Sequence, residues 1–184
     1  MFENLLKKIA RQLKKYKLPY MVIGGQAVLL YGEPRLTKDI DITLGVGIEK
    51  LKELISLSQN LNLKILVDNP DDFVKRTMVL PLEDKKSGIR IDFIFSFSVY
   101  ANLAIQRAVE IKFGRTPVKF ASLEDVVIHK TIAGRNRDIE DVKTILFKNP
   151  SFDKNYILYW LREFDKSLKE NFEKRFKQLL EDLK

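Results

Sequence analysis

Two short runs decide the fold of this chain: Ile23-Gly24-Gly25-Gln26 and, further on, Asp39-Ile40-Asp41-Ile42. The apolar residues 20–23 predict a strand. The two glycines that follow permit a sharp turn and a close approach to a ligand, because they lack a Cβ atom. Residues 26–31 are compatible with a helix, whose first N–H groups would face an anion. The first run therefore predicts a phosphate cradle.

The second run predicts a strand that carries two acids on one face. Side chains alternate across a strand, so Asp39 and Asp41 share a face and lie about 7 Å apart, at roughly 3.3 Å per residue. Two like charges so placed repel each other and require a cation or an arginine nearby. Mg²⁺ accepts carboxylate oxygens and leaves positions for phosphate oxygens. We therefore expect a metal site on this strand.

The spacing from the Gly-Gly turn to the Asp-Ile-Asp-Ile run resembles the signature of nucleotidyltransferases with a polymerase-β-like core. That signature becomes strong if a third acid follows on a later strand, and Asp92 stands inside the apolar run 89–95. A lone acid in such a run is costly to bury unless it is paired or bound to a metal. The resemblance implies that Asp92 is the third metal ligand. The alternative from the residues alone is an ion pair between Asp92 and Arg90.

A second motif contains Lys130, Gly134-Arg135, Arg137-Asp138 and Asp141. It resembles the C-terminal motif of the AbiEii-like branch of the superfamily, and Arg35-Leu36-Thr37-Lys38-Asp39 resembles the lead-in to the acidic strand of that branch. The resemblance implies that Lys130 is catalytic and reaches the nucleoside triphosphate. The implied nucleotide-binding set is Gly24, Gly25, Gln26, Arg35, Thr37, Lys130, Arg135 and Asp138.

The residues of this motif also allow simpler interpretations. Lys130 could extend its amine along an apolar helix to the surface. Asp138 and Asp141 could pair with Arg135, Arg137 or Lys143 on the same helix. In the first motif, Gln26 stands where many superfamily members have a serine or threonine, although an amide can still donate a hydrogen bond.

The composition of the chain excludes several classes of protein and of metal site. The 184 residues carry a formal net charge of +8, which favours polyanionic partners but also fits a solvated surface rich in Lys and Glu. The absence of cysteine excludes disulfides and thiolate metal sites, and a single histidine excludes a multi-histidine zinc centre. We find no signal peptide and no apolar run near the ~20 residues of a membrane helix, so we expect a cytoplasmic protein.

The remaining elements are predicted from periodicity. Residues 2–17 form an amphipathic helix whose cationic face either binds nucleic acid or is a solvated surface. A hairpin joins residues 76–82 to residues 89–95, and 118–120 is a short edge strand. Helices are expected at 49–61, 99–109, 123–133 and 136–148, with caps at Asp71 or Asp72, at Ser122 and at Asp153. Residues 151–184 form one helix or two, with an apolar stripe that packs on the N-terminal helix or on a second copy of the chain.

These inferences combine into one prediction. The fold class is α+β: a nucleotidyltransferase-like small mixed β-sheet backed by helices in residues 1–150, with a helical C-terminal extension in 151–184. Asp39, Asp41 and Asp92 hold two Mg²⁺ ions, with Mn²⁺ as an alternative, and a nucleotide monophosphate moves from a triphosphate to a hydroxyl of RNA, tRNA or a protein. The AbiEii-like resemblance implies a toxin-like enzyme that modifies transfer RNA. The rival hypothesis is a non-catalytic nucleotide- or RNA-binding module that retains the fold.

Overall fold

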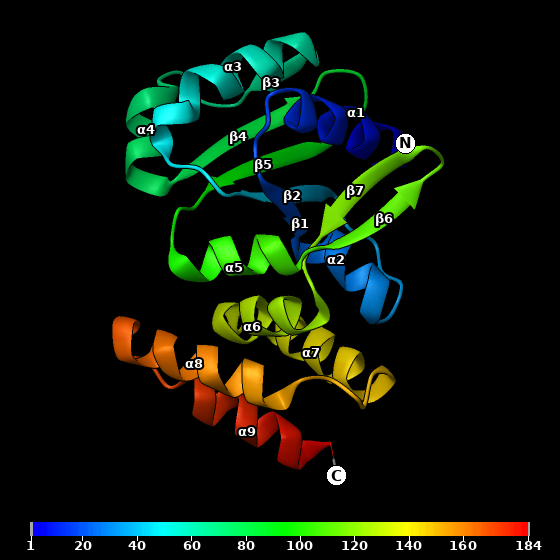
Figure 1. Ribbon diagram of the computed structural model, residues 1–184, viewed down its shortest axis with the longest axis vertical. Helices are drawn as coiled ribbons and strands as arrows, with labels where there is room; N and C mark the ends of the chain where they lie inside the picture. Colours follow the sequence, from blue (N-terminus) through cyan, green and yellow to red (C-terminus); the bar gives the residue numbers. More distant parts are fainter. Residues whose placement is uncertain (1, 184) are drawn as a thin grey trace. The chain divides into compact units, whose positions relative to one another are not determined.

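The computed structural model describes residues 2–183, and the chain divides into two compact units (Figure 1). The first unit comprises the chain up to Gln26 together with Thr37–Ala121. The second comprises Ala27–Leu36 and the chain from Ser122 onward. The first boundary falls inside helix α2 (Gly24–Tyr31), directly after the glycine turn.

The first unit is built on a mixed sheet, which confirms the α+β prediction. In the described chain its seven strands are ordered β3-β4-β5-β2-β1-β7-β6. The pairs β2–β5 and β1–β7 are parallel, and the other four pairs are antiparallel. The bounds are β1 Tyr20–Ile23, β2 Asp39–Leu44, β3 Leu63–Ile65, β4 Val79–Asp84, β5 Arg90–Phe95, β6 Val109–Phe113 and β7 Thr116–Phe120.

Strand β2 separates an apolar face from an acidic one, as its alternation predicts. Ile40, Ile42 and Leu44 are buried, whereas Asp39 is exposed and Asp41 is half-buried. Leu44 pairs with Tyr20, so the apolar side chains of β2 share a face with Tyr20 and Val22. Helix α1 (Phe2–Lys15) packs on the same side, and it buries Leu5, Leu6, Ile9, Ala10 and Leu13.

One predicted strand boundary and one predicted helix cap before the hairpin are wrong. Helix α4 runs over Pro70–Thr77 and ends at Met78, which has a φ of 58°, so β4 begins at Val79 and not at residue 76. The side chain of Asn69 caps this helix by accepting a hydrogen bond from the N–H of Asp72, in place of the predicted aspartate cap. The hairpin itself is confirmed, because β4 and β5 are antiparallel neighbours.

Residues 109–113 form a strand that the sequence interpretation missed. Helix α5 ends at Arg107 (Val99–Arg107), and β6 then pairs with β7 as a hairpin around Gly114, which has a φ of 62°. The predicted edge strand at 118–120 is therefore interior, between β1 and β6, and β6 is the edge. Helix α3 (Leu51–Asn60), preceded by a short 3-10 turn, confirms the helix predicted near 49–61.

The second unit is helical and agrees closely with prediction. Helix α6 (Leu123–Ala133) is capped by Ser122 and ends at Gly134 in the left-handed conformation, and α7 spans Asn136–Lys148. The C-terminal stretch forms two helices, α8 (Lys154–Leu168, capped by Asp153) and α9 (Phe172–Asp182). Helix α8 packs on α6 and α9 (Figure 1). This packing within the unit buries five residues of the apolar stripe and leaves Leu168 exposed; the buried ones are Ile157, Leu161, Phe172, Phe176 and Leu179.

Candidate active site

The two central acids lie side by side in the sheet of the first unit. Asp41 on β2 and Asp92 on β5 are register partners in a parallel pair, and Asp39 is opposite Arg90. Neighbouring strands are about 4.8 Å apart, so the two carboxylates project from adjacent positions on the same face. Asp39 precedes Asp41 by two residues and shares its face. The sheet thus gathers the three predicted metal ligands.

Asp92 is in an environment that disfavours its own charge. Its Oδ1 atom is buried and has no hydrogen-bond partner among residues 2–183. Burial raises the pKa of Asp92; the positive charge of Arg90 opposes this shift, and the negative charge of Asp39 adds to it. An unsatisfied buried oxygen of this kind costs about 1–3 kcal/mol. A bound cation would satisfy it.

The glycine turn approaches the carboxylates closely. Ile23 at the end of β1 pairs with Asp41, so Gly24 stands directly beside that side chain. Gly24 has a φ of 65°, and a Cβ atom at this position would overlap with the carboxylate of Asp41. Glycine is required here for both reasons.

The start of α2 offers donors for an anion. The N–H groups of Gly25 and Gln26 lie in its first turn, where a helix has no internal acceptors. The side chain of Gln26 is buried and donates to the Oγ1 atom of Thr37 at 2.5 Å. The amide that replaces the serine or threonine of related motifs therefore ties the turn to the segment just before Asp39, and the backbone remains the candidate phosphate ligand.

The carboxylates fit a hard divalent cation by their chemistry. Among residues 2–183, no group of three or more His, Cys, Asp or Glu side chains is arranged to hold a metal ion as it stands. Three oxygen-donor side chains on one face, one with an unsatisfied buried oxygen, nevertheless make the donor set that Mg²⁺ prefers.

The second motif forms a compact ion cluster in the helical unit. The Nζ atom of Lys130 on α6 lies 2.6 Å from Asp138 and 3.0 Å from Asp141, both on α7. Arg35 donates to both oxygens of Asp141 at 3.0 Å, and Arg135 donates to Asp138 at 2.6 Å. Lys130, Asp138 and Asp141 are buried, whereas the Arg135 side chain is 78% exposed. Three cations therefore surround two carboxylates.

The bonds in this cluster hold its acids in the charged form. Burial alone would raise the pKa of Asp138, but hydrogen bonds from Arg135 and Lys130 outweigh burial and hold the pKa below its usual value. Asp138 pairs with Arg135 as the helix pattern allows, whereas Asp141 pairs with Lys130 and the distant Arg35.

Asp141 is the member of the cluster that we left out of the predicted site. The available signal was its position three residues after Asp138, which places both acids on one face of α7. The structure thus divides the predicted residues into two groups. Gly24, Gly25, Gln26, Thr37, Asp39, Asp41 and Asp92 lie in the first unit, and Arg35, Lys130, Arg135 and Asp138 lie in the second.

The motifs and their geometry agree with a match to a known family. A family model described as "Nucleotidyl transferase AbiEii toxin, Type IV TA system" matches residues 5–183. The chain belongs to the AbiEii nucleotidyltransferase family. The match extends to residue 183 and so includes the C-terminal helices, which our sequence motifs did not reach. A search of curated proteins finds no match.

Solved structures show that the AbiEii chain has a nucleotidyltransferase fold. The antibiotic-resistance factor ANT(2'')-Ia, solved in solution, aligns with a TM-score of 0.62 and 17% identity over 91% of this chain and 94% of that chain. The lincosamide antibiotic adenylyltransferase LnuA, with lincomycin bound, aligns with a TM-score of 0.55 and 17% identity over 77% of this chain and 94% of that chain.

A third similar structure is an antigenic nucleotidyltransferase-like protein from Paracoccidioides brasiliensis. It aligns with a TM-score of 0.57 and 16% identity over 91% of this chain and 89% of that chain. Within residues 2–183 of the AbiEii chain, no helix is both long and apolar enough to cross a lipid bilayer.

Proposed function

We propose that this chain is a Mg²⁺-dependent enzyme that transfers a nucleoside monophosphate from a nucleoside triphosphate to a hydroxyl acceptor: the acceptor oxygen bonds to the α-phosphorus, the bond between the α- and β-phosphates breaks, and pyrophosphate leaves. The observation that carries the proposal is the parallel register of Asp41 and Asp92, together with the unsatisfied buried oxygen of Asp92. A binding module has no physical need for adjacent acids whose charges repel.

The carboxylates have a defined role in this proposal. Asp39, Asp41 and Asp92 would hold two divalent ions, Mg²⁺ or in its place Mn²⁺. Bound there, the ions would neutralise phosphate charge and lower the pKa of the attacking hydroxyl. The carboxylates would keep these charges on one face of the sheet, and the N–H groups of Gly25 and Gln26 would bind phosphate oxygens without a charge of their own.

For the ion cluster we propose anion binding. Arg135 is the most exposed of its cations, and the cluster has one more cation than it has carboxylates. Arg35, Lys130 and Arg135 would attract the triphosphate, while Asp138 and Asp141 fix the direction of the lysine amine. The acceptor class consistent with a toxin family is RNA, tRNA or a protein partner.

A label-transfer assay tests the proposal. Each α-³²P nucleoside triphosphate is incubated with Mg²⁺, the protein, total RNA and a cell extract, beside Asp41→Asn. Asp71→Asn is the matched control, because Asp71 is an exposed acid in the first turn of α4. We expect the wild type and the control to label a band, and Asp41→Asn to lose label by about 10³-fold or more with no loss of thermal stability.

Two outcomes of this assay contradict the proposal. Near-normal transfer by Asp41→Asn would show that the carboxylates are not needed for the reaction. Binding of the Mg²⁺ complex of a triphosphate without label in any acceptor would support the non-catalytic module instead. A labelled RNA band would name the acceptor as RNA, and a labelled protein band would name it as a partner protein.

A further inference from the structure

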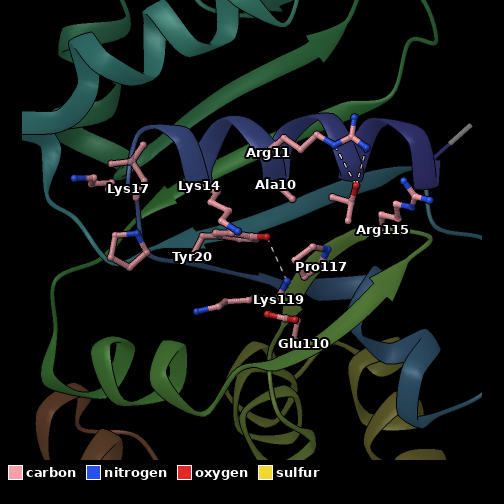
Figure 2. A pocket seen from close by; sticks show the side chains of 12 residues that line it. Ala10, Arg11, Lys14, Lys17, Tyr20, Glu110, Arg115, Pro117 and Lys119 are labelled. Carbon is pink, nitrogen blue, oxygen red and sulfur yellow. Dashed lines mark hydrogen bonds between the residues drawn. The ribbon is translucent and has the colours of Figure 1, made fainter.

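A cavity of about 580 Å³ lies in the first unit between α1 and the β6–β7 hairpin (Figure 2). This volume is within the range of sites that hold small molecules or single building blocks of polymers. Strands β1 and β7 have one registered pair, Val22 with Phe120. Beside it, the N–H group of Lys119 donates to the Tyr20 hydroxyl at 3.3 Å.

The floor of this pocket is apolar and its rim is cationic. Ala10, Leu18 and Tyr20 are buried, and Pro19 and Pro117 complete the apolar lining. The rim carries five cations, Arg11, Lys14, Lys17, Arg115 and Lys119, and a single acid, Glu110. Figure 2 shows these side chains arranged around the opening, from α1 on one side and the hairpin on the other.

The rim cations are not used to stabilise the fold through ion pairs. Within the described chain, none of the five forms a salt bridge with a carboxylate. Arg11 donates from Nε and Nη2 to the Oγ1 atom of Thr116 at 3.1 and 2.8 Å, which fixes its guanidinium across the pocket. This uses two of the five N–H donors of an arginine. A concentration of like charge on one rim favours an anionic ligand.

The positive charge continues beyond the pocket along α1. At 3.6 residues per turn, one face of this helix carries Lys7, Lys8, Arg11, Lys14 and Lys15, opposite the buried leucines. Of these five, Lys7 forms an ion pair with Glu3 at 3.0 Å. These five residues extend over about 12 Å, at 1.5 Å per residue. A single phosphorylated metabolite would occupy only the pocket, whereas a polyanion with regularly spaced charges would follow the whole face.

The pocket is separate from the carboxylate site. Tyr20 pairs with Leu44, whereas Asp41 pairs with Ile23, three positions away along the strands. This is a separation of about 10 Å at 3.3 Å per residue. The side chains of Tyr20 and Asp41 also project to opposite faces of the sheet, because successive residues alternate. A ligand in the pocket therefore does not occupy the proposed metal site.

We propose that this pocket and the cationic face of α1 bind a segment of single-stranded RNA several nucleotides away from its reacting end. A base and its ribose pack on the apolar floor, and the backbone phosphates lie against the rim and the helix. The identification of this RNA as the acceptor rests on the function proposed above. The binding itself does not, since it requires no transfer.

Fluorescence anisotropy with a labelled, unstructured 20-nucleotide RNA tests the binding. The test variant is the double substitution Lys14→Glu with Arg115→Glu. The control is Lys85→Glu with Lys86→Glu, two exposed residues of the β4–β5 turn in the same unit that do not line the pocket. Both variants change the net charge by the same amount.

We expect the pocket variant to bind the RNA at least 10-fold more weakly and the control to stay within about 2-fold of the wild type. The dependence of log affinity on log salt should also fall by about 0.7 for each lost phosphate contact on a single strand. Equal losses in both variants would mean diffuse attraction to a basic protein and would overturn the proposal. Pocket-dependent binding of polyglutamate that matches the affinity for RNA would overturn it in favour of an acidic protein partner.

A second measurement separates this inference from the proposed function. Asp41→Asn should retain RNA affinity while it loses label transfer, and the pocket variant should retain affinity for the Mg²⁺ complex of a triphosphate. If RNA binding depends on the pocket but the wild type transfers no label, the RNA-binding proposal is supported and the proposed transfer reaction is contradicted. If the pocket variant transfers label to the 20-nucleotide RNA as fast as the wild type, the pocket is not the acceptor site.

Discussion

The two charged regions of this protein differ in how their buried carboxylates are compensated. On β2 and β5, Asp41 and Asp92 stand side by side, and one buried oxygen of Asp92 is left unsatisfied among the described residues. Between α6 and α7, Lys130 lies within 3.0 Å of two carboxylates that arginines also bind. In the first region, burial and neighbouring like charge disfavour the ionised carboxylates. In the second region, each carboxylate is paired with a cation.

The difference indicates which region depends on a ligand. A compensated cluster retains its geometry without help, because each buried charge has a partner. The buried Oδ1 atom of Asp92, which has no hydrogen-bond partner among the described residues, destabilises the folded chain until a cation arrives. Substitutions should therefore have opposite effects on stability in the two regions, even if both reduce activity.

Replacement of Lys130 by methionine should give the largest change in stability. The substitution leaves two buried carboxylates without their shared cation, and loss of one partner from a buried ion pair costs about 3–5 kcal/mol. The measurement is urea unfolding followed by the fluorescence of Trp160, the single tryptophan of the chain, which lies on α8 of the same unit.

Lys143→Met is the matched control for this prediction. Lys143 forms only a surface pair with Glu140 at 3.8 Å, so its loss should cost less than about 1 kcal/mol. Equal costs for the two variants would mean that Lys130 is no better paired than a surface lysine, and the comparison between the two regions would fail.

Replacement of Asp92 by asparagine should have a smaller effect of the opposite sign. The change removes a charge that burial disfavours, so in a buffer with EDTA the metal-free protein should gain about 1 kcal/mol, or 2–4 °C in Tm by calorimetry. Added Mg²⁺ should stabilise the wild type and not the variant. A clear loss of stability in Asp92→Asn would instead favour the structural ion pair with Arg90.

The smallest expected effect is a pH dependence in the ion cluster. Because the folded pKa of Asp138 lies below its ordinary value of 3.8, its contribution is fully present above pH 3.8 and is lost as the pH falls through the depressed value. The stability gap between the wild type and Asp138→Asn should stay constant from pH 7 to about 4 and then close, by at most about 1.4 kcal/mol per pH unit. A gap that closes above pH 5 would show that the pKa is not lowered.

The parts of the fold that repeat a strong local pattern were predictable from the sequence. The alternation in Asp39-Ile40-Asp41-Ile42 gave the correct faces of β2, and the turn after residue 23 begins α2. Helix α7 has the predicted bounds, because Gly134 ends one helix and the apolar residues recur at helical spacing in the next. In these segments the local preference and the tertiary packing agree.

The errors occurred where tertiary partners decide the structure. Val109, Ile111 and Phe113 alternate with two charged residues, yet we assigned the start of this run to the preceding helix, so the pocket beside β6 was not foreseen. The role of Asp141 depends on Arg35, which is 106 residues away in the sequence. No local pattern contains such a pairing. The assignment of the site residues to catalysis remains a prediction.

The parallel pairing of β2 with β5 also determines the stage of synthesis at which the carboxylates of Asp41 and Asp92 become neighbours. Asp41 and Asp92 are about 50 residues apart in the chain, and β5 must dock beside β2 before they become neighbours. Contacts of this length form late, because the closure of the loop is unfavourable until the strands pair. A nascent chain that has emerged only as far as β4 therefore has its glycine turn but no complete acid set. The fold itself thus delays any activity until most of the sheet has assembled.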